Sequence, residues 1–249
     1  MSTSPVPPSP DTRPIWVRPE PGTRRARFSR EQIAAAALAI ADAEGFEAVS
    51  MRRIAAELGA GTMSLYRYIS AKDDLMALMD DALIGEFLIP EGELPADWRA
   101  AVTLIARQTR AAFLRHPWAV VALQGRGAAG QDGSFGPNGL RHFEQSLAAL
   151  DGAPLDTAAK LELLTIVDDY VMGSVLRAAE MQGRNQIDPE AAAPVMEFIT
   201  AQLATGAFPR ISALSQDPAA AALAEPGRVE ARFERGLALL IEHAAGVLG

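Results

Sequence analysis

Residues 62–68 carry side chains suited to hydrogen bonding with nucleic acid. Apart from the apolar Met63 and Leu65, the stretch combines hydroxyl, aromatic and basic side chains with no acid: Thr62, Ser64, Tyr66, Arg67 and Tyr68. Hydroxyl groups both donate and accept hydrogen bonds, and a guanidinium group can hold a base edge or a phosphate with two bonds. This composition favours a surface that contacts DNA.

The elements around this stretch are predicted to turn those side chains outward. Leu65 and Ile69 stand four residues apart, which gives a short helix one buried face. Ile54 and Leu58 have the same spacing in the segment before it, and Gly59 can adopt the left-handed conformation that ends a helix. A helix, a tight turn and a second short helix make a helix-turn-helix, whose second helix can enter the major groove.

Two short helices around a glycine also occur in all-α proteins that never bind DNA, so the flanking segments decide between the two interpretations. Ser29–Gln32 reads S-x-x-Q, a capping box that opens a helix, and Gly45 is expected to end that helix. Ser70–Asp73 reads S-x-x-D and predicts a further helix start. Three helices and the start of a fourth therefore fit before Phe87, and we predict a helix-turn-helix domain over residues 28–75.

The run from Phe28 to Met79 resembles the DNA-binding domain of TetR-family transcriptional regulators. The matching features are a first helix ending in E-G-F, an R-x-I-A-x-x-L-G helix, an S-L-Y-x-Y recognition helix and K-D-D-L at the fourth helix. The resemblance implies a ligand-responsive regulator, in the first place a repressor, that binds a pseudo-palindromic operator as a homodimer. At the matching positions, the residues that would contact DNA phosphates are Arg52, Lys72 and the Tyr66 or Tyr68 hydroxyl.

Four residues of the recognition helix are predicted to face the base edges, because the apolar residues must face inward: Thr62, Met63, Ser64 and Arg67. Thr62 and Ser64 each tolerate several bases, and Met63 can lie against a thymine methyl group. Arg67 alone can hold guanine O6 and N7 with two bonds, so we expect it to be the main reader. Contact of Arg67 with a phosphate is the alternative.

The composition limits the classes of protein to which the chain can belong. It has 249 residues, 49% of them hydrophobic, and no apolar run that approaches the length of a membrane span. It has no cysteine, so disulfides and thiolate metal sites are excluded. The N-terminus lacks the basic and apolar regions of a signal peptide, and we therefore expect a cytoplasmic protein.

The net charge of −8 is divided unevenly along the chain. Residues 1–75 carry ten Arg or Lys and nine Asp or Glu, whereas the rest carries thirteen and twenty-two. A modest basic surface on a separate N-terminal domain can still neutralise phosphates. This balance predicts binding to a specific site rather than general coating of DNA.

Residues 1–27 are rich in proline and are predicted to be a disordered tail. Arg24, Arg25 and Arg27 stand at its end, directly before the first helix. They form either an arm that contacts phosphates or the minor groove, or a solvated basic linker. The sequence does not decide whether Ile15 and Trp16 pack on the domain.

Residues 76–249 are predicted to form a larger, all-helical C-terminal domain. A fourth helix over residues 73–88 links it to the DNA-binding domain. Apolar spacing predicts further helices over residues 97–115, 140–150, 156–182, 191–203 and 229–241, with a proline- and alanine-rich connection at 206–227. The helix at 140–150 has a predicted apolar face made of Leu140, Phe143, Leu147 and Leu150. No strand is predicted, so the fold class is all-α.

The C-terminal half is similar to the tetracycline-repressor-like subgroup of the same family. The motifs RHPWAVVAL, GPNGLRHFEQSLAAL, DDYVMGSVLRAAE and FERGLALLIEHAA occur in the order found there. The resemblance implies a homodimer formed through the helices at 156–182 and 228–247, and a pocket for a small molecule. The pocket residues that it implies are Phe87, Ile105, Thr109, Phe113, Trp118, Leu123, Leu164, Asp168 and Met172.

The expected ligand is a largely apolar molecule with one or two polar groups. In the tetracycline repressor, polar side chains and a histidine hold a magnesium–tetracycline complex, and the positions that roughly correspond here are Leu88, Ile105, Thr109 and Leu123. Three of the four are apolar, His142 is predicted to face away from its helix's apolar stripe, and no two histidines have metal-ligand spacing. No metal or cofactor is therefore expected.

Several residues keep two interpretations at this stage. Asp168 and Asp169 either make a polar contact with the ligand or lie on the solvent-exposed side of a helix. Gly173 and Ser174 allow close helix approach, either across an interface or within the chain.

The sequence lacks a P-loop, a dinucleotide fingerprint, a G-x-S-x-G motif and a cysteine nucleophile, so no enzyme is predicted. The alternative is an all-α small-molecule-binding or interaction protein that does not regulate transcription.

Overall fold

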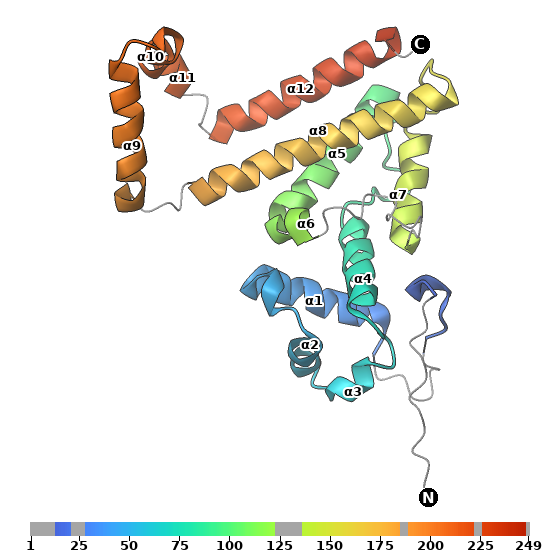
Figure 1. The fold of residues 1–249 in the computed structure, drawn as a ribbon. Helices are drawn as coiled ribbons and strands as arrows, with labels where there is room; N and C mark the ends of the chain where they lie inside the picture. The colour runs from blue at the N-terminus through green and yellow to red at the C-terminus, as the bar shows by residue number, and fades with distance from the viewer. Residues whose placement is uncertain (1–12, 21–27, 123–135, 185–188, 222–225, 248–249) are drawn as a thin grey trace, which may run out of the picture. The chain divides into compact units, whose positions relative to one another are not determined.

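The computed structural model describes residues 13–20, 28–122, 136–184, 189–221 and 226–247. All regular structure in these ranges is helical, which confirms the all-α fold class (Figure 1). The helices divide between two compact units, Met1–Gly152 and Ala153–Gly249, and each is described by itself. Helix α4 packs on both α1 and α7, so these helices belong to the same unit.

The first unit contains nine helical elements within the described residues. In chain order they are η1 (Ile15–Val17), α1 (Arg30–Glu44), η2 (Phe46–Ala48), α2 (Met51–Glu57), α3 (Thr62–Leu65), α4 (Lys72–Gly85), α5 (Trp98–Arg115), α6 (Pro117–Ala122) and α7 (Pro137–Ala148). The elements η1 and η2 are short 3-10 turns, and the others are α-helices.

Capping side chains and glycines set the ends of α1 and α2, as the sequence predicts. The Ser29 hydroxyl accepts a hydrogen bond from the Gln32 N–H (3.2 Å), and the Gln32 side chain accepts one from the Ser29 N–H (3.0 Å). Gly45 follows α1 with a φ of 88°. Gly59, just after α2, has a φ of 60°, in the left-handed region that glycine adopts without strain.

The apolar faces of α1, α2 and α3 meet in one hydrophobic core. Ile54 and Leu65 are fully shielded from solvent, and Ile33 of α1 and Ile69 lie in the same cluster. Leu58 is half-buried and packs against this cluster. The inward-facing positions predicted for the helix-turn-helix are therefore confirmed. Full burial of one such side chain contributes about 1.5–3 kcal/mol to folding.

Helix α4 begins at Lys72, one residue later than a cap at Ser70 predicts. The Asp74 carboxylate, rather than Asp73, accepts hydrogen bonds from the backbone N–H groups of Ser70 (2.8 Å) and of the next residue (3.1 Å). The predicted S-x-x-D cap is wrong by one residue. The shift follows because Asp74 is also held from outside the helix by Arg18, a contact that the local pattern does not contain.

Residues 13–20 pack on the core of the first unit, so the predicted disordered tail over residues 1–27 is wrong for this segment. Ile15 is 2% exposed, and Trp16 packs against the same cluster. An isoleucine and a tryptophan bury enough apolar area to hold a short segment in place. The rest of the predicted tail lies outside the described residues, including Arg24, Arg25 and Arg27.

Two arginines fasten this N-terminal segment to the helices. The Arg30 guanidinium of α1 donates hydrogen bonds to the backbone carbonyls of Ile15 (2.7 Å) and Arg18 (3.0 Å). Arg18 in turn forms an ion pair with Asp74 and donates a hydrogen bond to the Ser70 hydroxyl (2.5 Å). Residues 13–20 are therefore a structural part of the first unit.

Helix α7 faces α4 with polar residues and not with the apolar stripe predicted from its sequence. Leu140 and Phe143 of that stripe are 57% and 38% exposed, which corrects the prediction for these two positions. On the side towards α4, the Asp81 carboxylate accepts hydrogen bonds from the backbone N–H groups of Asn138 (2.9 Å) and Gly139 (3.0 Å). Asp81 thereby satisfies N–H groups in the first turn of α7.

Further polar contacts join α7 to the segment that follows α4. The Gln145 amide forms two hydrogen bonds with the backbone of Ile89, accepting at 3.1 Å and donating at 2.5 Å. Burial raises the pKa of Asp81, although its hydrogen bonds oppose the shift. A Cβ atom at Gly136 would lie 2.1 Å from the Asp81 carboxylate, so only glycine permits this approach. Leu150, at the end of the predicted stripe, is buried.

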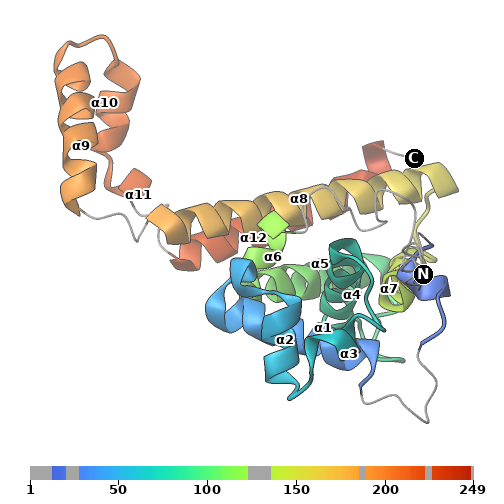
Figure 2. The same ribbon diagram turned by 60° about the horizontal axis from the view of Figure 1, so that its bottom comes forward.

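The second unit is built on two long helices that lie side by side, α8 (Thr157–Arg184) and α12 (Pro226–Val247) (Figures 1 and 2). The Tyr170 and Phe233 rings stack with their centroids 5.6 Å apart, and the Tyr170 hydroxyl donates a hydrogen bond to the Phe233 carbonyl (3.1 Å). A Cβ atom at Gly236 would lie 2.1 Å from the Tyr170 hydroxyl, so this pairing needs a glycine.

Between these helices lie α9 (Pro189–Ala204), α10 (Pro209–Ser215) and α11 (Pro218–Ala221). The predicted connection over residues 206–227 therefore contains two short helices, because Pro209 and Pro218 stand at first helical positions that tolerate proline. Helices α9 and α10 pack together (Figure 2). Their exposed large apolar side chains are Val195, Met196, Phe198, Ile199, Phe208, Ile211 and Leu214.

Removal of the Ile15 side chain tests whether the N-terminal segment belongs to the core. Ile15→Ala should lower the free energy of unfolding by about 2–5 kcal/mol, because it deletes a buried side chain and leaves a cavity. Val17→Ala is the matched control, since Val17 is 61% exposed and its loss should change little. Urea denaturation of both variants measures the difference. Equal, small effects would show that residues 13–20 contribute nothing to the fold.

Candidate nucleic-acid interface

We call residues 62–69, which comprise α3 and the turns after it, the recognition segment. The turn between α2 and α3 fixes where this segment starts. The Ala60 N–H donates a hydrogen bond to the Ala55 carbonyl (2.8 Å), which closes the chain back onto α2. Regular helix ends at Leu65, and beyond it the N–H groups of Tyr68 (2.9 Å) and Ile69 (3.1 Å) both donate to the Leu65 carbonyl. The recognition segment is thus one α-helical turn continued by tighter turns.

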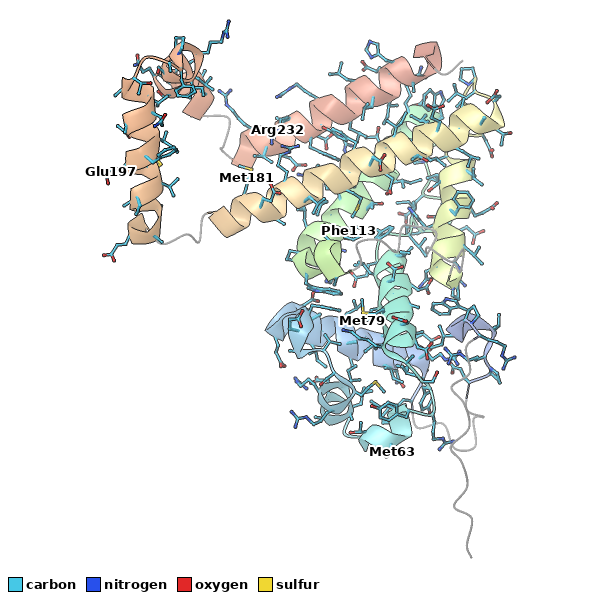
Figure 3. All side chains as sticks on the ribbon, viewed as in Figure 1. Met63, Met79, Phe113, Met181, Glu197 and Arg232 are labelled. Carbon is cyan, nitrogen blue, oxygen red and sulfur yellow. The ribbon has the colours of Figure 1, made fainter. Side chains whose placement is uncertain are left out.

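The outer face of this segment carries Met63, Tyr66 and Arg67. Met63 is 77% exposed and Tyr66 is 50% exposed, whereas Leu65 between them is fully buried. Arg67 is exposed as well. Figure 3 shows Met63 on α3, while Met79 of α4 belongs to the buried core. This face therefore exposes a flexible apolar side chain, a phenol and a guanidinium group to solvent.

Thr62 and Ser64 are half-buried at the start of α3. The Ser64 hydroxyl donates a hydrogen bond to the Gly61 carbonyl (2.5 Å), so its proton is used within the turn. Its oxygen keeps lone pairs that can accept a hydrogen bond from outside. Ser64 is in this arrangement an acceptor, which suits an amino group on a base edge.

Tyr68 differs from Tyr66 in its surroundings. Tyr68 is 4% exposed, and its hydroxyl accepts a hydrogen bond from the Phe28 N–H (3.4 Å). It packs in the core cluster that also contains Ile69. Of the two tyrosines between which the sequence left the choice open, Tyr66 is the one with a side chain at the surface.

An open groove of about 480 Å³ lies beside the recognition segment, between the start of α2 and the start of α4. Its lining combines the polar groups of Ser50, Tyr66 and Lys72 and the carboxylate of Glu47 with apolar residues such as Ile69 and Leu75. Lys72 is exposed at the first position of α4. Hydroxyl and ammonium groups around such a groove can hold a phosphate chain.

Two neighbouring arginines in α2 have different surroundings. Arg52 is exposed and forms no ion pair within the part of the chain that the structure describes. Arg53 pairs with Glu44 (2.7 Å) and with Glu57 (2.8 Å), and its hydrogen bond lowers the pKa of Glu44. Arg52 is therefore available for a phosphate, whereas Arg53 is committed to the packing of α2.

Sequence reasoning missed the contact that fixes the turn before Lys72. Burial by itself raises the pKa of Asp74, but the hydrogen bonds from Arg18 and Ser70 outweigh it and hold that pKa below its usual value. Asp74 therefore stays ionised and anchors the chain between α3 and α4. The signal was absent from the local pattern because Arg18 lies in the segment predicted to be a tail.

The predicted pocket residues of the first unit are mostly shielded from solvent. Phe87, Ile105 and Thr109 are buried, and Phe113 is half-buried with its ring centroid 6.3 Å from that of Phe87. Trp118 is turned towards α1 and η2, because it stacks on the Phe46 ring at 5.7 Å and its indole N–H donates to Asp42 (2.7 Å). These contacts give Trp118 a structural role.

The remaining predicted pocket residues are distributed differently. Leu164, Asp168 and Met172 lie on α8 in the second unit, and Leu123 lies outside the described residues. Leu164 and Met172 are half-buried, whereas Asp168 is exposed. Local desolvation of its carboxyl group, followed by the charge of Asp169, raises the pKa of Asp168.

His142 stands next to Phe87, which the sequence did not indicate. The two rings meet edge to face with their centroids 5.0 Å apart. Burial lowers the pKa of His142 to about 4, so its imidazole is neutral at neutral pH. His142 faces away from Leu140 and Phe143, as predicted, but its side of α7 is the packed one, because Leu140 and Phe143 are the residues that face outward.

No group of three His, Asp or Glu side chains in the described ranges could hold a metal ion. No helix among them is long and apolar enough to cross a membrane.

Two family models match consecutive parts of the chain. The model described as "Bacterial regulatory proteins, tetR family" matches residues 33–79, which cover α1 to the middle of α4. The model described as "Tetracyclin repressor-like, C-terminal domain" matches residues 91–246. The second match alone spans more than half of the chain, and the first coincides with the surface described above.

Individual relatives agree with these matches. The HTH-type transcriptional repressor DrrR1 of Streptomyces coeruleorubidus is 36% identical over 207 residues, 80% of this chain and 73% of that protein. An HTH-type transcriptional regulator of Saccharopolyspora erythraea is 32% identical over 241 residues, 94% and 92% of the two chains. The structure of ActR from Streptomyces coelicolor in complex with actinorhodin is similar with a TM-score of 0.65 and 29% identity, covering 90% and 98%. The chain therefore belongs to the TetR family of ligand-responsive transcriptional regulators.

Proposed function

We propose that the chain is a repressor that binds a pseudo-palindromic operator as a homodimer and that a small molecule modulates this binding. The observation that carries the proposal is the outward face of α3, where Met63, Tyr66 and Arg67 are exposed next to the groove lined by Lys72. A ligand that fits one dimer state better changes the spacing of the two recognition segments. We assign it no enzymatic activity, and we place it in the cytoplasm, where operator DNA lies.

The proposed DNA contacts divide into two groups. Thr62, Met63, Ser64 and Arg67 face base edges, with Arg67 as the main reader. Arg52, Tyr66 and Lys72 hold phosphates and set the position of the duplex. The tyrosine contact is assigned to Tyr66 because the Tyr68 hydroxyl is buried.

The proposed dimer forms through α8 and α12, residues 156–182 and 228–247. Leu161 and Leu239 on these helices are 41% and 58% exposed, and exposed leucines on long helices favour a helix–helix interface. A Cβ atom at Gly173 would meet no atom within 4 Å, which leaves room for a close approach by a second chain. The exposed apolar residues of α9 and α10 also favour a contact in which a second copy of the chain buries them.

The proposed effector is a largely apolar molecule with one or two polar groups. ActR has been solved with actinorhodin and with (S)-DNPA, and its likeness to this chain supports a ligand of small-molecule size. The apolar cluster of Phe87 and Phe113 and the neutral imidazole of His142 suit such a molecule. Of the pocket residues that the family resemblance implies, Phe87, Ile105, Thr109, Phe113 and Trp118 lie in the first unit, and Leu164, Asp168 and Met172 of α8 lie in the second.

A gel shift with the DNA upstream of the protein's own gene tests the proposed function. We expect a dimer in sedimentation at micromolar concentration and a salt-dependent complex with that DNA. A fragment of unrelated sequence serves as the control and should bind about a thousandfold or more weakly. A monomer that binds neither fragment would favour the alternative, a ligand-binding protein that does not regulate transcription.

Lys72→Ala tests the phosphate contacts. The substitution should weaken binding to operator and unrelated DNA alike, and it should reduce the slope of log affinity against log salt by about one unit. Lys160→Ala is the matched control, because Lys160 lies on α8 in the second unit and should leave the slope as it is. An unchanged slope for Lys72→Ala would contradict the contact.

Arg67→Ala tests base reading. If Arg67 holds a guanine, the variant should lose about 1–3 kcal/mol of binding free energy on the true site. It should lose much less on a site in which that guanine is replaced. Fluorescence anisotropy with the two duplexes gives both values, and equal losses would assign Arg67 to the DNA backbone.

A further inference from the structure

His116 joins three parts of the first unit through its two ring nitrogens. Its Nδ1 lies 2.7 Å from the Asp42 carboxylate of α1, and its Nε2 lies 2.9 Å from the Glu86 carboxylate at the end of α4. His116 itself caps the C-terminal end of α5, directly before α6, and is 7% exposed. One imidazole ring therefore connects α1, the end of α4 and the corner between α5 and α6.

The charged neighbours of this ring are a pair of carboxylates and one arginine. Asp42 also accepts a hydrogen bond from the Trp118 indole N–H (2.7 Å), and Glu86 also pairs with Arg115 (3.2 Å). A carboxylate accepts hydrogen bonds and has none to give, so both ring nitrogens must carry a proton for both contacts to form. A neutral imidazole has one N–H, and its bare nitrogen would then face a carboxylate.

We propose that His116 is a positioning residue whose protonated ring locks the DNA-binding helices onto the α5–α6 corner, so that operator affinity falls as the ring loses its proton. The inference rests on the proposed function, because the lock acts on DNA binding. Two copies of α3 must be held at one spacing to reach successive grooves. If the His116 contacts are lost, the helices must be ordered on binding, and this lowers the affinity for DNA. The locked state therefore binds tightest.

The pH range follows from the surroundings of the ring. Burial alone lowers the pKa of His116, but the hydrogen bonds and charges of Asp42 and Glu86 outweigh it and raise that pKa above its usual value. A group with a raised folded-state pKa stabilises the fold fully at low pH, and this contribution is lost as pH rises through the folded value. The lock is therefore closed below the ordinary histidine value of about 6.5 and opens as pH rises through the raised folded-state pKa.

Operator affinity measured by anisotropy between about pH 6 and pH 9 at constant salt tests the lock, with the upstream DNA fragment as probe. Wild-type affinity should fall about five- to tenfold over this range. His116→Asn should bind weakly at every pH. Glu86→Gln should bind tightly at every pH, because a glutamine amide can donate to the bare nitrogen of a neutral ring. His243→Gln, at an exposed histidine of α12, should keep the wild-type profile.

A wild-type slope in either His116→Asn or Glu86→Gln would overturn the inference while leaving DNA binding intact. The absence of DNA binding in the wild type would instead contradict the proposed function. NMR titration of the His116 ring tests the lock in the absence of DNA. The ring should lose its proton at a pH above the ordinary histidine pKa of about 6.5. Glu86→Gln should lower that titration point, and a ring that titrates at or below the ordinary value overturns the lock.

Discussion

The packing of Leu65 and Ile69 against Ile54 is the constraint on which the proposed DNA-binding surface depends. These three side chains are shielded from solvent, and they fix which face of the recognition segment points outward. The residues at 63, 66 and 67 are exposed as a consequence of that packing. Because α3 is only one regular turn long, the apolar contacts and not the helix itself hold this orientation.

Besides its apolar packing, helix α4 and the residue after it make polar contacts with other parts of the first unit. Near its start, Asp74 holds Arg18 and the turn that precedes Lys72. Near its middle, Asp81 caps α7, and beyond its end Glu86 meets His116. Charged and hydrogen-bonded contacts need exact geometry, so a small displacement of α4 changes their strength more than it would change an apolar contact.

The sequence pattern predicted the features that depend on residues close together in the chain. The Ser29 cap, the helix ends at Gly45 and Gly59, and the inward positions of the helix-turn-helix were all readable from spacing and residue type. The proposed surface residues follow from the same pattern, with burial of Tyr68 visible only in the structure.

Contacts between distant residues were not readable in this way. Ile15 and Arg18 join the core from a proline-rich segment, and no helical period marks them. In α7 the polar side packs inward because Asp81 and the backbone of Ile89 supply partners for Asn138 and Gln145. Because a periodic apolar stripe predicts burial, the pattern wrongly predicted that Leu140 and Phe143 are buried.

Hydroxyl-radical footprinting of the DNA upstream of the protein's own gene tests the central claim most directly. If two copies present α3 at one spacing, protection should appear as two related half-sites centred about 10–10.5 base pairs apart, or a multiple of this, on one face of the duplex. A single unpaired region of protection, or uniform protection without sequence symmetry, would contradict the account.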